Sequence, residues 1–321
     1  MDIFRTLSKN AAAKKRTIIL PESSEPRVIE AVKILLKKKI CNIILIGDKS
    51  KTIPLPDNDS LTVIDPEFNS QFVSEYILLR KKKLALSKEA ALKELNDPLT
   101  FAAMLLKNGF CDGLIAGSVY PTSSVIRAGL NIVGIKKGFN IISSFFLMTF
   151  PSSHIHKNRV LAFADCGVVP EPDSIELAEI AIQTSDSFKK LTGINPRTAF
   201  LSFSTKGSSS YTGIEKVNSA YNIASKKRKD IIFEGELQFD AAFHKAVGAR
   251  KNPDGKIQGD ANVFIFPDLN SGNIGYKIAE RIGGAIATGP ILQGFNKPVM
   301  DLSRGCTASD IVNMAKVICN I

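Results

Sequence analysis

The stretch that decides the fold class is residues 17–47, which read TIILPESSEPRVIEAVKILLKKKICNIILIG. Short apolar runs at 17–20 and 43–46 are typical of buried strands. Three lysines at 37–39 follow the intervening segment, where the carboxyl end of a helix favours cations. The apolar residues of that segment recur at helical spacing on one face: Val28, Val32, Leu35 and Leu36. The stretch therefore predicts a β-α-β unit with parallel strands.

The same alternation of strands and helices continues along the chain. In the first half we expect a strand at 113–117 between helices at 97–108 and 123–133. In the second half we expect strands at 141–148, 160–164, 198–204, 231–235 and 263–266. Helices are expected between and after these strands, at 173–191, 213–226, 239–247 and 272–282. No internal repeat or low-complexity tract interrupts the pattern.

The predicted fold class is α/β, with two α/β domains and a cleft between them. The length of 321 residues is sufficient for two domains, and the segment at 136–138 is the best boundary. We expect an N-terminal domain of residues 1–138 completed by the C-terminal segment 299–321, and a second domain of residues 139–298. A cleft between packed domains is a usual ligand position.

Composition excludes several classes of protein. Apolar residues make up 44% and charged residues 23%, which is typical of a folded globular chain and not of a disordered or fibrous one. The longest apolar run, 141–150, is shorter than the ~20 residues of a membrane helix and contains two serines, so we expect no membrane span. The first ten residues lack the cationic and then apolar layout of a secretory signal, so we expect a cytoplasmic protein.

Cysteine and histidine offer little material for a metal site. The five cysteines include no C-x-x-C pair, and the three histidines form no H-E-x-x-H motif. We therefore expect reduced thiols and no protein-bound metal.

The net charge of +11 has three explanations: a nucleic-acid surface, a polyanionic small ligand or a lysine-biased composition. The basic clusters at 37–39, 80–83 and 226–229 each lie near the end of a predicted helix, where cations are favoured. No zinc finger, RNP-like aromatic motif or basic heptad array accompanies the charge, which disfavours nucleic-acid binding.

Two loops have compositions that suit anions. The chain has neither G-x-G-x-x-G after a strand nor a P-loop, but 204–208 (STKGS) resembles a phosphate-binding turn, with a flexible serine-rich loop as the alternative. Residues 117–127 (GSVYPTSSVIR) open a predicted helix and form a second candidate anion site. The alternative there is an ordinary N-cap by Thr122 or Ser123 with Arg127 exposed.

The most informative segment is 301–310, DLSRGCTASD, which leads into an apolar helix. Thr307 and Asp310 match a capping box, which is the structural interpretation. The functional interpretation is compatible with it, because a helix N-terminus attracts anions and Arg304 adds a planar donor fork. Together with Ser303, these groups meet the needs of acyl transfer, namely stabilising an oxyanion and removing a proton.

An ordered set of short motifs identifies a family. The chain resembles the phosphate acetyltransferases, or phosphotransacetylases, of the phosphate acetyl/butyryltransferase family over essentially its whole length. The motifs that carry the resemblance are LPE at 20–22 leading to Arg27, DG at 112–113 with Gly117, ADC at 164–166, SFSTKGS at 202–208, EGELQFDAA at 234–242, NVFIFPDLN at 262–270, GP at 289–290, QG at 293–294, KP at 297–298 and DLSRGC at 301–306.

The resemblance implies the reaction and its partners. Acetyl-CoA and inorganic phosphate exchange with acetyl phosphate and CoA by direct attack in a ternary complex, with no metal and no tightly bound cofactor. CoA and acetyl-CoA are therefore substrates. The resemblance also implies a two-domain fold like that of the isocitrate and isopropylmalate dehydrogenases, a homodimer, and a site in the interdomain cleft.

The resemblance also assigns roles to five residues of this chain. Asp310 is the base for the CoA thiol, Ser303 donates a hydrogen bond in the transition state, and Arg304 holds acetyl phosphate. Arg80, at the head of the 80–83 cluster, matches a CoA-binding arginine, and Arg127 occupies the other active-site arginine position.

Several alternatives remain open at this point. Phosphate butyryltransferase activity differs only in the pocket that holds the acyl chain. A decarboxylating dehydrogenase of similar fold and a basic nucleic-acid-binding protein belong to other functional classes. Within the acetyltransferase reading, Cys306 offers a route through an acetyl-enzyme, with a packed small hydrophobe as the structural alternative.

Overall fold

The computed structural model describes residues 3–47, 55, 58–80 and 86–321. These residues group into two compact units. The central unit is Gly138–Gly294, and the terminal unit combines the described residues between 3 and 137 with Phe295–Ile321. The chain thus leaves the terminal unit once and returns to it near its C-terminus.

The described part of the terminal unit contains a parallel sheet with the strand order β11-β4-β1-β2-β3. Its inner strands are short, buried and apolar, as a sheet covered on both faces requires. The strands are β1 (Thr17–Leu20), β2 (Asn42–Ile46), β3 (Leu61–Ile64), β4 (Gly113–Ala116) and β11 (Val299–Asp301).

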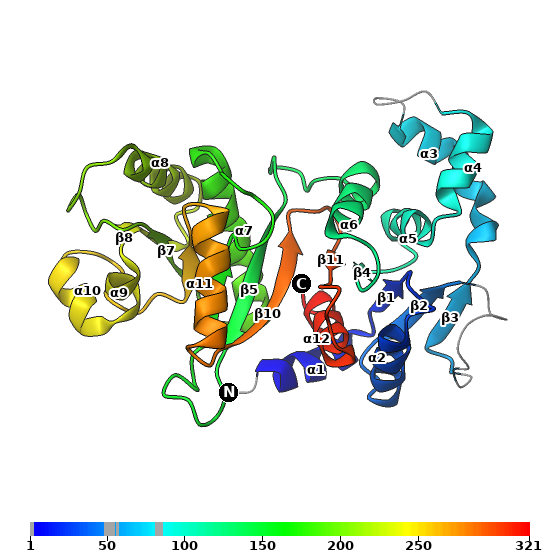
Figure 1. The fold of residues 1–321 in the computed structure, drawn as a ribbon, viewed down its shortest axis with the longest axis horizontal. Helices are drawn as coiled ribbons and strands as arrows, with labels where there is room; N and C mark the ends of the chain where they lie inside the picture. Colours follow the sequence, from blue (N-terminus) through cyan, green and yellow to red (C-terminus); the bar gives the residue numbers. More distant parts are fainter. Residues whose placement is uncertain (1–2, 48–54, 56–57, 81–85) are drawn as a thin grey trace. The chain divides into compact units, whose positions relative to one another are not determined.

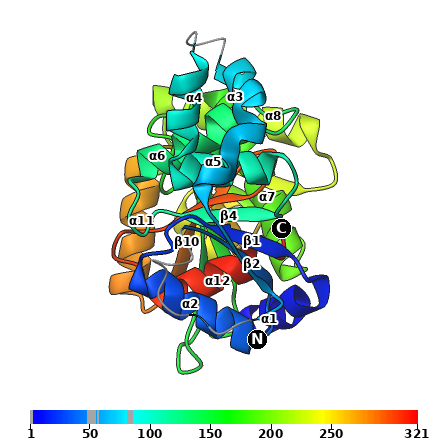
Figure 2. The same cartoon turned by 90° about the vertical axis from the view of Figure 1, so that its right-hand side faces the viewer.

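Helices cover both faces of this sheet (Figure 1). One face carries α1 (Ile3–Lys14), α2 (Pro26–Lys37) and α12 (Ala308–Ile318). The other face carries α5 (Pro98–Lys107) and α6 (Thr122–Ala128), which continues as a π-helical turn, η2 (Gly129–Val133). Figure 2 shows these two layers on either side of β1, β2 and β4. Around α5 pack the 3₁₀ helix η1 (Pro66–Phe72), α3 (Val73–Arg80) and α4 (Lys88–Leu95).

The predicted β-α-β unit is confirmed. Residues 17–20 of β1 pair in parallel with 42–45 of β2. Between them α2 begins after Glu25, with Pro26 in its first turn, and ends at Lys37. Proline is favoured at this position because its missing N–H has no partner inside the helix anyway. The apolar stripe Val28, Val32, Leu35 and Leu36 is buried, as its spacing predicts.

The central unit contains a mixed sheet with the strand order β10-β5-β6-β9-β7-β8 among its described residues. Its strands are β5 (Ser143–Thr149), β6 (Leu161–Ala164), β7 (Arg197–Leu201), β8 (Ile232–Leu237), β9 (Val263–Ile265) and β10 (Ile286–Gln293). The expected alternation of strand and helix fails at one place, because β5 pairs antiparallel with both β6 and β10. The connection from β5 to β6 contains no helix, and antiparallel neighbours need no crossover.

Helices also flank the central sheet. The expected helices at 173–191, 213–226 and 272–282 correspond to α7 (Ser174–Thr192), α8 (Thr212–Lys227) and α11 (Leu269–Arg281). The expected single helix at 239–247 is wrong. It is two short helices, α9 (Phe239–Phe243) and α10 (Lys245–Lys251), because His244 between them adopts an extended backbone.

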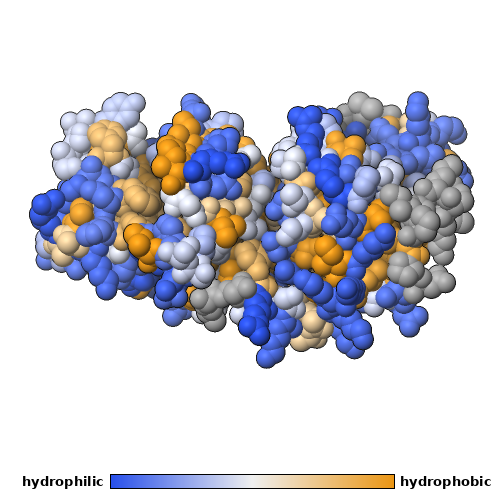
Figure 3. All heavy atoms as spheres, turned by 60° about the horizontal axis from the view of Figure 1, so that its bottom comes forward, coloured by the Kyte–Doolittle hydropathy of each residue, from blue (hydrophilic) through white to orange (hydrophobic). Residues whose placement is uncertain are grey.

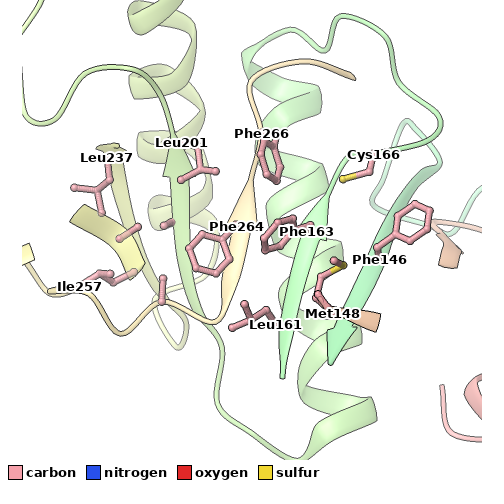
Figure 4. Close-up of a cluster of buried hydrophobic side chains, with 14 residues drawn as sticks. Phe146, Met148, Leu161, Phe163, Cys166, Leu201, Leu237, Ile257, Phe264 and Phe266 are labelled. Carbon is pink, nitrogen blue, oxygen red and sulfur yellow. The ribbon is translucent and has the colours of Figure 1, made fainter. Parts of the chain in front are cut away.

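A cluster of buried side chains holds the central sheet to the helices on one face (Figure 4). Aromatic rings of the neighbouring strands β6 and β9 meet at its centre, where the rings of Phe163 and Phe264 lie 5.4 Å apart in an edge-to-face arrangement. Tyr276 of α11 stacks on Phe146 of β5 with ring centroids 4.0 Å apart. Such aromatic pairs stabilise a core by about 0.5–1.5 kcal/mol each beyond the area they bury.

The observed return to the terminal unit precedes the expected boundary at 298 by a few residues. Phe295 bridges to Ile135, and Lys297 Nζ donates to the carbonyl oxygen of Leu106 (2.8 Å). Both partners belong to the terminal unit.

The described members of the three basic clusters lie at or just after helix ends, as expected. Lys37, Arg80, Lys226 and Lys227 lie in the last turns of α2, α3 and α8. Figure 3 shows one face of the molecule, on which hydrophilic residues surround scattered apolar groups. Within the described residues, no helix combines the length and apolar character needed to cross a bilayer.

Candidate active site

The loop between β11 and α12, together with the first turn of α12, carries the three residues expected to perform the chemistry. It leaves the sheet at Leu302, whose N–H donates to the carbonyl oxygen of Ala116 at the end of neighbouring β4 (2.8 Å). A turn follows, in which the N–H of Cys306 donates to the carbonyl oxygen of Ser303 (2.9 Å). The loop thus lies at the carboxyl edge of a parallel sheet, the usual position of ligand sites in α/β folds.

Asp310 performs the predicted capping role. Its Oδ2 accepts from the N–H and the hydroxyl of Thr307 (2.8 Å each), and the Thr307 hydroxyl accepts from the N–H of Asp310 (3.3 Å). The capping box is therefore confirmed. Among the described residues, Oδ1 of Asp310 receives no hydrogen bond and the residue is exposed. The carboxylate can therefore cap α12 and still accept a proton at Oδ1.

Arg304 and Ser303 present their side chains to solvent. The Arg304 guanidinium makes no hydrogen bond or ion pair with any residue that the structure describes. The Ser303 hydroxyl oxygen accepts from the N–H of Gly305 (3.2 Å), which leaves the hydroxyl proton available as a donor. The loop therefore offers one uncompensated cation and one hydroxyl donor to an incoming anion.

The N–H groups at the start of the second candidate anion site, 117–127, are not available to a ligand. They already bind a carboxylate of the protein, that of Glu22 in the loop after β1. Oε1 of Glu22 accepts from the N–H of Val119 (2.7 Å), Tyr120 (2.9 Å) and Gly117 (3.1 Å). Oε2 accepts from the N–H of Ser118 (3.1 Å) and, in a short contact, from its hydroxyl. Glu22 is buried, so this cradle is closed to a ligand.

The expected N-cap of α6 is also absent. Pro121 occupies the N-cap position, with no capping hydrogen bond from a side chain. Thr122 instead donates its hydroxyl to Oδ2 of Asp301 at the end of β11 (2.6 Å). Burial raises the pKa of Asp301 to about 6, with the negative charge of Glu22 adding to the effect and the Thr122 hydrogen bond opposing it. Oδ1 of Asp301 is buried without a hydrogen-bond partner.

Arg80 and Arg127 line one pocket of about 400 Å³ in the terminal unit. Arg80 ends α3, and its Nε is buried without a hydrogen bond, 3.7 Å from Oε2 of Glu94. Arg127 lies in α6 and is exposed, with no partner for its guanidinium among the described residues. The structure thus brings together two arginines that are far apart in the sequence. The remaining members of the 80–83 cluster lie outside the described residues.

Two tyrosines fix the acidic side of this pocket. The hydroxyl of Tyr76 donates to Glu94 (2.5 Å), and that of Tyr120 donates to Asp97 (2.7 Å). Burial, followed by the hydrogen bond to the carboxylate, raises the pKa of each phenol. Both tyrosines therefore stay neutral donors to these carboxylates, and Oε2 of Glu94 is shared between Tyr76 and Arg80.

The STKGS turn at 204–208 of the central unit is not an open phosphate site. Its groups bind the buried carboxylate of Glu236, whose Oε1 accepts from the N–H of Gly207 (2.8 Å) and the hydroxyl of Ser204 (2.9 Å). Lys206 is paired as well, with Nζ 2.5 Å from Glu234. The protein thus supplies its own anions to this turn, and the resemblance to a phosphate-binding turn is misleading.

Cys306 packs as a small buried residue. Burial raises the pKa of its thiol, with nearby carboxylates adding to the effect and Arg27 opposing it. A protonated thiol is a poor nucleophile. The geometry therefore favours the structural interpretation of Cys306 over the acetyl-enzyme route.

Metal ligands do not gather in the part of the chain that the structure describes. No group of three or more His, Cys, Asp or Glu residues there is arranged to hold a metal ion. All five cysteines are buried and free. His154 and His156 lie in the loop after β5 and pack against the ring of Phe150.

Two anchoring residues of the terminal unit were given no role by the sequence. Glu22 and Arg27 belong to the LPE motif and its following arginine, and both reach the loops described above. The only signal in the sequence is their membership of that motif, because their partners lie far away along the chain.

Comparison with known proteins decides the family. A sequence model of the family described as phosphate acetyl/butaryl transferase matches residues 2–319. The chain belongs to this family. The phosphate acetyltransferase of Thermoanaerobacterium thermosaccharolyticum is 41% identical over 320 residues, covering 98% of this chain and 97% of the relative. The phosphate acetyltransferase of Bacillus subtilis is 41% identical over 324 residues, covering 98% of each chain.

Solved structures of the family agree with the fold. A phosphotransacetylase from Streptococcus pyogenes superimposes with a TM-score of 0.93 at 38% identity, covering 99% of this chain and 97% of that one. The mixed α/β architecture is therefore that of phosphotransacetylases. Membership of the phosphate acetyl/butaryl transferase family makes the chain an acyltransferase.

Proposed function

We propose that the protein is a phosphate acetyltransferase, which exchanges an acetyl group between CoA and inorganic phosphate. The observation that carries this proposal is the name of its curated relatives, which are about as long as this chain and 41% identical to it. The same names favour acetyl over butyryl transfer. CoA, acetyl phosphate and inorganic phosphate are then the substrates, and the reaction needs no resident metal or tightly bound cofactor.

The proposed reaction is a direct attack within a ternary complex. The thiol sulfur of CoA bonds to the carbonyl carbon of acetyl phosphate, while the bond from that carbon to the phosphate oxygen breaks. The thiol proton passes to Oδ1 of Asp310, and inorganic phosphate leaves. In the reverse direction a phosphate oxygen attacks the thioester, and CoA leaves as the thiol.

Asp310 must act in concert with the attack. An ordinary thiol has a pKa near 8.5 and an ordinary aspartate near 3.9, so complete transfer before attack is uphill by roughly 6 kcal/mol. Transfer during C–S bond formation avoids a free thiolate. The guanidinium of Arg304, which has no partner among the described residues, would neutralise the phosphoryl group, and Ser303 would donate to the developing oxyanion.

Arg80 and Arg127 would hold CoA. The support is their shared pocket in the terminal unit. Arg80 makes only a 3.7 Å ion pair with Glu94 there, and neither guanidinium donates a hydrogen bond to the described residues that line the pocket. CoA carries phosphates, and the planar guanidinium fork binds phosphate in a bidentate manner. Whether the two domains enclose this site in a cleft, as in the isocitrate dehydrogenases, stays a prediction.

We also propose a cytoplasmic homodimer. The free cysteines suit a reducing compartment. Helix α11 and its C-cap residue expose an apolar stripe at a spacing of four residues, with Ile274 57%, Ile278 52% and Ile282 84% exposed. A stripe of this kind is typical of an interface, and sedimentation at several protein concentrations tests for the dimer.

Phosphate-dependent formation of acetyl phosphate from acetyl-CoA tests the proposed function. The wild-type enzyme should show it, and acetyl phosphate should outperform butyryl phosphate in the reverse assay. Arg304→Ala should lower turnover by about 10²–10³-fold, the cost of removing one preorganised donor, while Arg304→Lys should lose less because it keeps the charge. A wild-type enzyme that is inactive with both acyl groups would refute the proposal.

A further inference from the structure

One side chain of the terminal unit, Arg27, binds three separate segments. It lies in the first turn of α2. Its Nη1 donates to the carbonyl oxygens of Arg304 (2.7 Å) and Cys306 (2.9 Å) in the β11–α12 loop. Its Nη2 donates to the carbonyl oxygen of Ser118 after β4 (3.0 Å), and its Nε donates to Glu25 (2.7 Å).

These contacts follow from the order of the strands. The sheet order β11-β4-β1 places the segments after these three strands at one edge. A guanidinium at this edge can reach all of them, because its donors form a rigid planar fork. The carboxylate of neighbouring Glu25 accepts from the remaining donor, Nε. This hydrogen bond raises the pKa of Arg27, so the guanidinium stays charged.

Two of these segments, that of Ser118 and the β11–α12 loop, differ in how firmly other residues hold them. The segment of Ser118 is fixed by the buried carboxylate of Glu22, which binds consecutive N–H groups from Gly117 to Tyr120. The β11–α12 loop between its ends has only local bonds within 303–306 among the described residues. Arg27 therefore joins a weakly held loop to a rigid frame.

We propose that Arg27 is a positioning residue for the acetyl transfer: it fixes the main chain that carries Ser303 and Arg304. This proposal rests on the proposed function. The guanidinium of Arg304 has no side-chain partner among the described residues, so its position depends on its own backbone, and Arg27 holds the carbonyl of that residue at 2.7 Å. Arg27 touches no reacting atom in this scheme and acts only through the loop.

Substitution of Arg27 should lower turnover more than substrate binding. In Arg27→Met the hydrogen bonds of the guanidinium are lost, and we expect kcat to fall about 10²-fold, the cost of a displacement near 1 Å at a reacting group. The KM for CoA should change by less than about 3-fold, because the pocket of Arg80 and Arg127 does not contact Arg27. Arg27→Lys keeps the charge but cannot reach all acceptors, so its kcat should fall about 10-fold.

Arg16 provides the matched control. It precedes β1 at the opposite end of the strand, and its Nη1 pairs with Asp112 at 2.7 Å. Arg16→Met therefore also removes an arginine with its ion pair from the same unit, and kcat should stay within about 2-fold of the wild type. An equal loss of kcat in Arg16→Met and Arg27→Met would overturn the proposal, since general destabilisation would then explain both.

A double mutant distinguishes positioning from independent effects. If Arg27 acts through Arg304, then adding Arg27→Met to the Arg304→Ala enzyme should lower kcat by less than about 3-fold, because the group that Arg27 positions is already gone. If the loss of kcat in the double mutant equals the product of the two single losses, Arg27 acts elsewhere. If Arg27→Met does not fold, Arg27→Lys serves in the same cycle with its smaller expected loss.

Amide hydrogen exchange tests the contact without any activity. In Arg27→Met, the N–H groups of Gly305 and Cys306, which bond within the loop, should exchange at least about 10-fold faster than in the wild type. Unchanged exchange would overturn the role of Arg27 whatever the activity. An inactive wild-type enzyme with faster exchange in the variant would instead reject the proposed acetyl transfer and leave the contact established.

Discussion

The STKGS turn of the central unit and the β11–α12 loop of the terminal unit have similar compositions but opposite surroundings. Each combines hydroxyl residues, a glycine and one cation. In the turn, Glu236 takes the hydroxyl of Ser204 and the N–H of Gly207, and Lys206 pairs with Glu234. In the loop, the guanidinium of Arg304 has no partner among the described residues.

The difference shows what separates an anion site from a sequence that merely suits anions. A buried carboxylate is stable only when donors surround it. A turn rich in N–H groups and small residues can serve such a carboxylate of the same protein, as the turn at 117–120 also does for Glu22. Only donors that no internal carboxylate occupies remain for a substrate, and the β11–α12 loop keeps them.

The largest effect should come from Asp310→Asn, at the start of α12 next to the loop. Turnover should fall about 10²–10⁴-fold, because general-base assistance is lost. The amide oxygen of asparagine can still accept from Thr307, so the cap remains and the free energy of unfolding should change by less than ~1 kcal/mol. Steady-state kinetics and urea unfolding measure the two quantities.

Thr307→Ala is the converse control for this prediction. It removes the capping hydroxyl and leaves the carboxylate, so it should cost about 1 kcal/mol of stability and little turnover. A folded Asp310→Asn enzyme with nearly wild-type turnover would reject Asp310 as the base. The β11–α12 loop would then differ from the STKGS turn only in its unpaired donors.

Much of the fold could be predicted from the sequence, because its elements are strongly periodic. The apolar runs of β1 and β2 and the stripe of α2 lie where the pattern places them. Three strands, β3, β10 and β11, are not found in this way. The interior of β10 contains the Gly289–Pro290 pair and a register shift, and β11 has only three residues. In β10 and β11 tertiary pairing, and not local pattern, makes the strand.

The candidate site could be predicted only in its local part. The capping box of Thr307 and Asp310 spans four residues, so its spacing reveals it. The cradle of Glu22 joins residues 95 or more positions apart, and nothing in either segment indicates the other. The pocket shared by Arg80 and Arg127 likewise depends on how α3 and α6 pack. Only resemblance to the family placed these two arginines at one site.

The next largest effect should be on stability, in the turn. In Glu236, burial raises the pKa, but hydrogen bonds from Gly207, Ser204 and Asn218 outweigh it and lower the pKa overall. The carboxylate therefore stabilises the fold at pH values above its unfolded pKa near 4.3. Glu236→Gln should lower the free energy of unfolding at pH 7 by about 2 kcal/mol, because it weakens several charge-assisted hydrogen bonds.

The pH dependence of that loss tests its cause. Because the folded pKa is depressed, the stabilisation disappears as the pH falls through it, so wild type and Glu236→Gln should approach equal stability below about pH 4. Urea unfolding at pH 7 and pH 3.5 measures this. A constant difference between the two proteins would mean that shape, and not charge, makes Glu236 fit the turn.

A smaller effect of opposite sign is expected beside the loop, at Asp301. Its folded pKa of about 6 exceeds the ordinary value, so the native state binds more protons than the unfolded chain between about pH 4 and pH 6. Wild-type stability therefore falls as the pH rises through this range. Asp301→Asn keeps an acceptor for Thr122 and removes the buried charge, so it should stabilise the protein by about 1–2 kcal/mol at pH 8 and hardly at all at pH 4.

Thermal unfolding across pH 4 to 8 checks this prediction. Equal stabilisation by Asp301→Asn at every pH, or destabilisation at pH 8, would show that the buried charge of Asp301 does not destabilise the fold, although its Oδ1 has no hydrogen-bond partner. The loop would then resemble the turn, with its carboxylate fully satisfied.

The smallest effect should come from Cys306→Ala, within the loop itself. The thiol is buried, and burial raises its pKa, so it is protonated at neutral pH and contributes only packing. Turnover should stay within about 3-fold of the wild type, with a stability loss of about 1 kcal/mol for the small cavity. Mass spectrometry of the wild-type enzyme after incubation with acetyl phosphate, without CoA, should detect no acetyl adduct. An adduct on Cys306, together with an inactive alanine variant, would replace direct attack by an acetyl-enzyme, and Asp310 would then have no CoA thiol to deprotonate in the first half of the reaction.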